Sequence, residues 1–142
     1  MKLITYFKMG LICLTMLVLS CEKDDIKVSN SEYVSGGIGT SQTTGAIEFN
    51  FKIPRHYASG KVSVELPDLG IYDEVQGTGD LQIKFLNISS GTYNYLFELW
   101  ALENNFGGGG VEDGHPLNKY FTLDENLEVR NGKTLKIKVD LD

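Results

Sequence analysis

The chain has 142 residues and a formal net charge of −6. This length suits one domain with an ordinary core, and the acidic balance disfavours nucleic acid or an anionic lipid surface as a partner. Both cysteines, Cys13 and Cys21, lie within the first 21 residues, so the remaining chain forms no disulfide and depends on its core alone.

Residues 1–20 have the order of a secretory signal peptide. Lys2 and Lys8 precede an apolar run over residues 9–19. This run is too short to span the roughly 30 Å of a bilayer core. The segment ends in LVLSC, which resembles the bacterial lipobox, where the cysteine is acylated and the peptide is cut before it. The resemblance implies a lipid on Cys21, and removal of the leader takes the net charge from −6 to −8. The competing interpretation is the N-terminal helix of a cytosolic protein.

The next segment is expected to connect an anchor to a domain. Glu22-Lys23-Asp24-Asp25 resembles the short export signal of Bacteroidota surface lipoproteins, which implies the outer face of the outer membrane; retention in the periplasm is the alternative. Residues 22–44 are rich in Ser, Thr, Gly and charge, which predicts a flexible tether, with a short strand around Glu32–Val34 as a further option. The predicted divisions are 1–20 signal peptide, 21–44 lipidated cysteine and tether, and 45–142 β-sandwich.

From Gly45 onward the apolar residues alternate with polar ones. This period of two predicts half-buried strands, separated by Pro, Gly and Asp. Residues 69–75 are predicted as a short strand or an irregular crossover, and residues 55–60 as a loop. The predicted strands up to residue 85 cover residues 46–53, 61–66 and 81–85.

The second half of the domain centres on residues 94–102, which are apolar on both faces and predict a central strand. A helix competes for this segment, but its aromatic content and the preceding Gly91 favour a strand. Four consecutive glycines then predict a long loop over residues 103–116. Asn131-Gly132 is typical of a two-residue hairpin. Further strands are predicted at residues 117–123, 127–130 and 133–142, which makes the fold all-β, a single antiparallel β-sandwich.

Ile88 followed by Gly91-Thr92-Tyr93 resembles the signature of transthyretin-like sandwiches, which include carboxypeptidase regulatory-like and Cna B-type domains. In these families the glycine makes the turn into a core strand, and the tyrosine packs at the end of the sandwich. Cna B-type domains often carry a Lys–Asn crosslink, but the last strand here offers Asp140 and Asp142 instead of asparagine. Immunoglobulin-like and fibronectin-like sandwiches remain open, because alternation alone does not define strand order.

No motif in the sequence predicts catalysis. His56 and His115 have no further ligand at zinc spacing, and Ser89-Ser90 lacks the pattern of a catalytic serine. The glycine run is followed by acidic residues, which repel phosphate. A calcium site would use hard oxygen ligands of the same loop, although their spacing matches no known calcium loop: Asn104, Asn105, Glu112 and Asp113.

The best candidate for ligand binding is a set of loop aromatics, Tyr57, Tyr72 and Phe106, together with His115. Exposed rings of this kind stack on sugars or anchor a protein partner; the alternative is that each packs on the edge of the sandwich. We therefore expect a non-enzymatic, lipid-anchored outer-membrane protein without a cofactor. It would be a binding or accessory module of an envelope complex, or alternatively a surface protein that binds glycans or small ligands.

Overall fold

The alternating segments form eight β-strands in the computed structural model, which describes residues 26–103 and 118–141. The expectation of an all-β sandwich is confirmed. In chain order the strands are β1 (Ile26–Ser35), β2 (Thr44–Ile53), β3 (Tyr57–Leu66), β4 (Ile71–Gly77), β5 (Gly79–Ser89), β6 (Gly91–Glu103), β7 (Asn118–Val129) and β8 (Lys133–Leu141). A 3-10 turn, η2 (Pro67–Leu69), joins β3 to β4.

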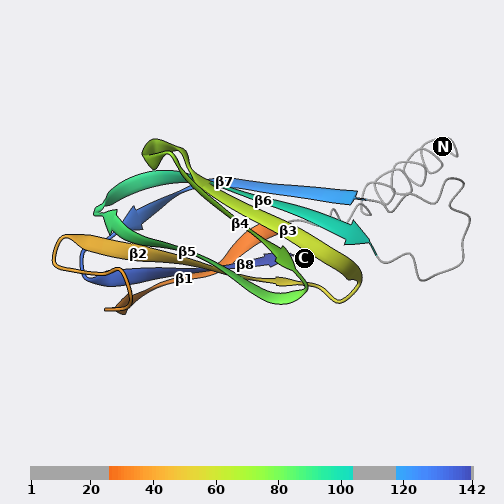
Figure 1. The fold of residues 1–142 in the computed structure, drawn as a ribbon, viewed down its shortest axis with the longest axis horizontal. Helices are drawn as coiled ribbons and strands as arrows, with labels where there is room; N and C mark the ends of the chain where they lie inside the picture. Colours follow the sequence, from red (N-terminus) through yellow and green to blue (C-terminus); the bar gives the residue numbers. More distant parts are fainter. Residues whose placement is uncertain (1–25, 104–117, 142) are drawn as a thin grey trace, which may run out of the picture.

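The strands form two four-stranded sheets packed face to face. Sheet A has the order β1-β8-β2-β5 and sheet B the order β4-β3-β6-β7; sheet B is the upper layer in Figure 1 and sheet A the lower. Neighbours are antiparallel, as expected, except β2 and β8, which run parallel. The order also differs from an immunoglobulin sandwich, in which the first two strands are neighbours, because β8 lies between β1 and β2.

The N-terminal strand corrects the predicted domain boundary. β1 pairs along its length with β8, Ile26 is buried, and the hydroxyl of Tyr33 donates a 2.6 Å hydrogen bond to the carbonyl of Glu128. The flexible tether predicted over residues 22–44 is therefore wrong from Ile26 onward. The alternation of β1 is hard to recognise in the sequence because β1 is an edge strand, and its pairing shifts between Val28 and Asn30.

The core lies between the two sheets and is built around Phe49 of β2. Phe49 is fully buried, and its ring centroid lies 5.1 Å from that of Tyr95 and 6.3 Å from that of Phe97, both on β6. The predicted inward faces of the strands at residues 46–53 and 133–142 are confirmed, and residues 94–102 form a strand with neighbours on both sides. The period-two pattern thus identified most of the core.

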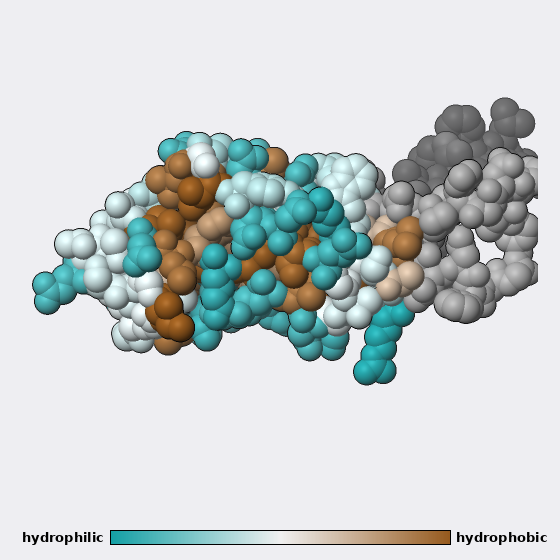
Figure 2. Space-filling model, in the orientation of Figure 1, coloured by the Kyte–Doolittle hydropathy of each residue, from teal (hydrophilic) through white to brown (hydrophobic). Residues whose placement is uncertain are grey.

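Strands β4 and β5 lie side by side at one edge of the sandwich, where they cross the front of Figure 1. Ile71, Val75 and Leu81 of these strands are only partly buried, and Figure 2 shows hydrophobic residues among hydrophilic ones on this side. Within the described ranges, the chain contains no helix with the length and apolar character needed to cross a membrane.

Candidate recognition surface

Most of the site residues expected from the sequence lie outside the described residues. These are the lipidation candidate Cys21, the ring-bearing Phe106 and His115, and the four calcium candidates Asn104, Asn105, Glu112 and Asp113. In the part of the chain that the structure describes, there is no cluster of three or more His, Cys, Asp or Glu residues arranged to hold a metal ion.

Tyr57 is not a surface ligand-binding residue. The predicted loop over residues 55–60 ends at Tyr57, which begins β3 and is 3% exposed. Its ring packs 4.1 Å from that of His56, measured between centroids. The prediction for Tyr57 is therefore wrong, and the alternative, in which the ring closes the edge of the core, describes its position.

Tyr72 remains exposed, but it lies on a strand instead of a loop. It belongs to β4 and is 55% exposed. Its hydroxyl donates a hydrogen bond to Glu74 two residues along the same strand. Because side chains two residues apart share one face of a strand, Tyr72 points to the outer side of sheet B. The structure thus does not bring Tyr57 and Tyr72 together.

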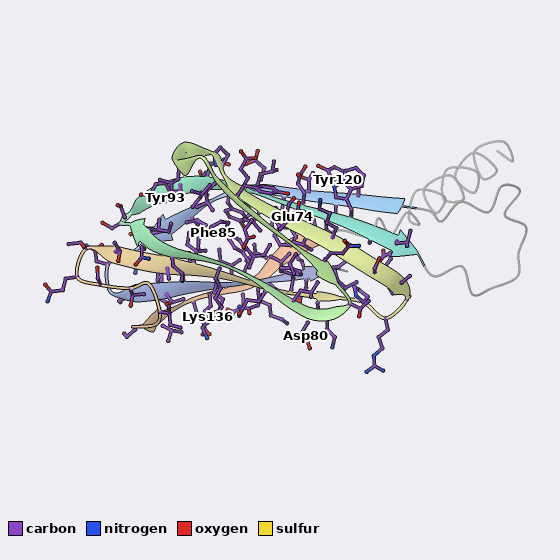
Figure 3. The ribbon with its side chains drawn as sticks, in the orientation of Figure 1. Glu74, Asp80, Phe85, Tyr93, Tyr120 and Lys136 are labelled. Atoms are coloured by element: carbon purple, nitrogen blue, oxygen red, sulfur yellow. The ribbon has the colours of Figure 1, made fainter. Side chains whose placement is uncertain are left out.

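Large apolar side chains that stay exposed identify two other surfaces. Three of them are aromatic and lie on the outer face of sheet B: Tyr72, Trp100 and Tyr120, which we call the aromatic face. Three are aliphatic and line one pocket on the outer face of sheet A: Val34, Ile38 and Leu86. The two surfaces lie on opposite sides of the sandwich, as Tyr120 above sheet B and Lys136 below sheet A show in Figure 3.

The centre of the aromatic face is a pair of rings on neighbouring strands. Trp100 of β6 is 49% exposed and Tyr120 of β7 is 45% exposed. They are directly opposite each other in the antiparallel register, and their ring centroids are 4.4 Å apart with an interplanar angle of 43°. Cross-strand aromatic pairs of this geometry stabilise each other. The rings therefore form a preformed apolar platform that half faces solvent.

Carboxylates lie among the rings. Glu98 of β6 accepts hydrogen bonds from the Tyr120 hydroxyl and, at 3.4 Å, from the hydroxyl of Ser63 on β3. On the other side of β3, the Lys61 ammonium lies 2.8 Å from Glu74. These contacts hold the Glu98 and Glu74 carboxylates in defined positions. The aromatic face is thus bordered by oriented hydrogen-bond acceptors.

These contacts also set the protonation states on the aromatic face. The hydrogen bond to Glu98 raises the pKa of Tyr120, and the bond to Glu74 raises the pKa of Tyr72. The hydrogen bond from Lys61 lowers the pKa of Glu74. Near neutral pH both tyrosines therefore keep their protons, and Glu74 stays ionised as an acceptor.

The aromatic face is not identified in the sequence analysis, because both faces of residues 94–102 are treated there as apolar. The strand is central within its sheet, but its outer face is open to solvent. Its outward residues include Trp100 but also Glu98 and Asn94. A charged residue two positions before a tryptophan indicates that both face solvent. That pattern was the available signal.

Comparison with known proteins adds no assignment to this geometry: no protein-family model matches the chain, and no curated protein matches it in sequence.

Proposed function

We propose that this protein is a non-enzymatic binding module, anchored to the outer membrane through a lipid on Cys21, and that its sandwich binds neutral glycans through the aromatic face. The membrane attachment is supported by the leader and its LVLSC ending. In this position the module serves as an accessory component of the cell envelope, displayed at the cell surface. The resemblance to transthyretin-like sandwiches is supported over the immunoglobulin-like alternative by the position of β8 between β1 and β2.

The observation that carries the proposal is the half-exposed pair of Trp100 and Tyr120 on adjacent strands. Exposing two large rings forgoes the free energy that their burial would contribute. Both sit on regular strands, so a ligand would lose little free energy to ordering them. An aromatic ring face packs well against the apolar face of a sugar ring, while the hydroxyl and indole N–H can hydrogen-bond at its rim.

The charges on the aromatic face favour a glycan over a protein partner. The cores of protein–protein interfaces are depleted in charged residues, especially Lys and Glu. Here Lys61, Glu74 and Glu98 lie among the rings, so a dry protein interface would have to desolvate them. Sugar hydroxyls, by contrast, can donate to exposed carboxylates without full dehydration. The same carboxylates repel anionic polysaccharides, which makes neutral glycans the expected class.

Trp100 is the only tryptophan of the chain, so its fluorescence reports directly on this surface. The test uses the polypeptide from Glu22 to Asp142, which contains both sheets. We expect soluble neutral glucans or mannans to change the Trp100 emission saturably and to protect it from acrylamide quenching, whereas pectin and alginate do not. If no saccharide protects Trp100 but a membrane protein that co-purifies with the chain does, the accessory role would stand without glycan binding.

The anchor is tested separately, in cells that make the full chain. Mass spectrometry of the native protein should find an N-terminus at Cys21 that carries acyl groups, and the Cys21→Ala variant should lose both the cleavage and the lipid. An intact Met1 or an unmodified sulfur at position 21 would contradict the proposed attachment.

A further inference from the structure

A second candidate site is the apolar pocket on the outer face of sheet A. The pocket has a volume of about 280 Å³ and is lined by residues of β1, β2, β5 and β8, together with the loop after β1. Val34, Ile38 and Leu86 form its apolar wall and are 40%, 83% and 40% exposed. Three of the seven large apolar side chains that stay exposed in the described residues thus meet at one concavity.

The loop that carries Ile38 is held in place from both sides. On one side the hydroxyl of Thr134 donates to the carbonyl of Gly36 at 2.9 Å, and on the other the amide of Asn87 donates to the carbonyl of Gly39 at 3.0 Å. Gly39 has a φ of +79°, and a Cβ there would lie 2.5 Å from Cβ of Leu86. Because the loop is fastened at both ends of the Ile38 segment, the pocket wall exists before any ligand binds.

A β-bulge in β5 makes this fastening possible. In the pairing with β2, Ile88 is opposite Gly45 and Phe85 is opposite Ile47, so Leu86 and Asn87 together face a single residue. Asn87 adopts a left-handed φ of 57°. The extra residue leaves the Asn87 amide free to bond the loop, and Leu86 faces outward. Bulges often re-aim side chains next to functional sites.

The lining of the pocket carries a net positive charge although the chain is acidic. Its charged members are Glu48, Lys84 and Lys136. The carboxylate of Glu48 lies 3.2 Å from the Lys84 ammonium and 3.8 Å from that of Lys136. One carboxylate therefore faces two ammonium groups, and the side chains of both lysines are nearly half exposed. This leaves one positive charge for a ligand at the mouth of an otherwise apolar pocket.

A larger polar groove continues from the apolar pocket along the same face. It has a volume of about 610 Å³ and shares Glu48 and Lys136 with the pocket. Its other lining side chains include Asn30, Asn50 and Lys138 and the acidic Glu32, Asp80 and Asp140, so the excess of positive charge is confined to the lining of the apolar pocket. Lys136 thus lies at the boundary between the apolar pocket and the polar groove, and Lys84 lies in the pocket.

We propose that the apolar pocket binds a small, soluble amphiphile with one negative charge, such as a medium-chain fatty-acid carboxylate. The apolar tail lies against Ile38 and Leu86, and the headgroup lies toward Lys84 and Lys136. This site is independent of the aromatic face, since it is on the opposite side of the sandwich.

Octanoate is the probe that tests this assignment, with octanol and octylammonium as matched ligands of the same tail. Octanoate should bind saturably to the polypeptide from Glu22 to Asp142. The titration is followed by calorimetry and by the NMR amide signals of β5 and of the loop after β1. We expect octylammonium to bind at least about tenfold more weakly, because it meets the net positive charge. Added salt should narrow this difference.

Paired variants locate the site. Leu86→Asn should weaken octanoate binding about tenfold, whereas Leu69→Asn, an exposed leucine outside the pocket, should change it less than about twofold. Ile38→Ser should also weaken binding, and its side chain is so exposed that folding cannot depend on it. Lys136→Gln should weaken octanoate about threefold but leave octanol unchanged, and Lys138→Gln is its control.

Several results would overturn the assignment. These are no saturable octanoate binding, equal binding of octanoate and octylammonium, equal losses in Leu86→Asn and Leu69→Asn, or binding only to vesicles of anionic phospholipid. A change in Trp100 emission without shifts in the pocket signals would also overturn it. Octanoate binding at the pocket without any effect of glycans on Trp100 would support this site while contradicting the proposed glycan function.

Discussion

Replacing Trp100 by alanine should weaken glycan binding about tenfold. A tryptophan side chain offers roughly 200 Å² of contact surface, and Trp100 is 49% exposed, which leaves about 100 Å² free. A sugar ring covers one face of the indole, or about 50 Å², and at about 25 cal/mol per Å² this contributes about 1.3 kcal/mol. A difference of about 1.4 kcal/mol corresponds to a tenfold change in Kd. The second ring of the pair, Tyr120, still offers a partial platform.

The assay is isothermal titration calorimetry, because the variant lacks the only tryptophan and cannot be followed by its emission. Each titration uses the neutral glycan that gives the strongest signal with the unmodified chain. Leu69→Ala is the matched control, since it removes an exposed apolar side chain that is not part of the aromatic face. If Trp100→Ala binds the glycan within about twofold of the unmodified chain, the rings do not contribute and the reasoning fails.

Three further predictions concern stability. Gly45→Ala should lower the free energy of unfolding in urea by about 3 kcal/mol, because a Cβ would lie 2.5 and 2.9 Å from main-chain oxygens of the β7–β8 hairpin. Gly70→Ala has open space around it and should lower the free energy of unfolding by only about 1 kcal/mol, because of its positive φ. Equal losses of stability in the two variants would refute the steric explanation. Phe49→Ala should cost about 4 kcal/mol by the same assay, with Phe49→Leu far milder, and a loss below about 1 kcal/mol would mean that the ring is not central to the core. Burial alone would raise the pKa of Glu48, but hydrogen bonds from Asn50 and Lys84 and the charge of Lys136 lower it overall. The ionised Glu48 therefore stabilises the fold above its unfolded-state pKa of about 4.3, and this stabilisation is lost as the pH falls through the lower folded-state pKa. Glu48→Gln should flatten the dependence of the unfolding free energy on pH in this range, and an unchanged dependence would contradict the prediction.

The strands with an unbroken period of two were predictable from the sequence. In β2 and β8 the apolar residues of one face lie in the core or, for Leu141, pack against it, because alternation over several residues leaves only one way to bury them. β1 and β4 were harder to predict. Both are edge strands with few inward side chains, and the parallel pairing of β2 with β8 joins segments whose register no local pattern records.

The candidate sites were predicted less well than the fold. Loops were expected to carry the ligand-binding rings, yet Tyr57 is in the core and Tyr72 is on a strand. An aromatic residue gives the same sequence signal whether it is buried or exposed, so the apolar character of residues 94–102 does not reveal that Trp100 faces solvent. The apolar pocket was not foreseen at all, because it is built by four strands and a bulge that meet only in the folded chain.

If the proposed lipid on Cys21 is present, the early start of the first strand limits how far the sandwich can move from a membrane. Only four residues, Glu22–Asp25, separate Cys21 from Ile26, and the five extended steps between Cys21 and Ile26 span about 17 Å. A free segment up to residue 44 would have reached several times farther. A lipid on Cys21 would therefore hold the sandwich almost against the headgroups, so that it samples molecules at the bilayer surface and cannot search the space beyond it.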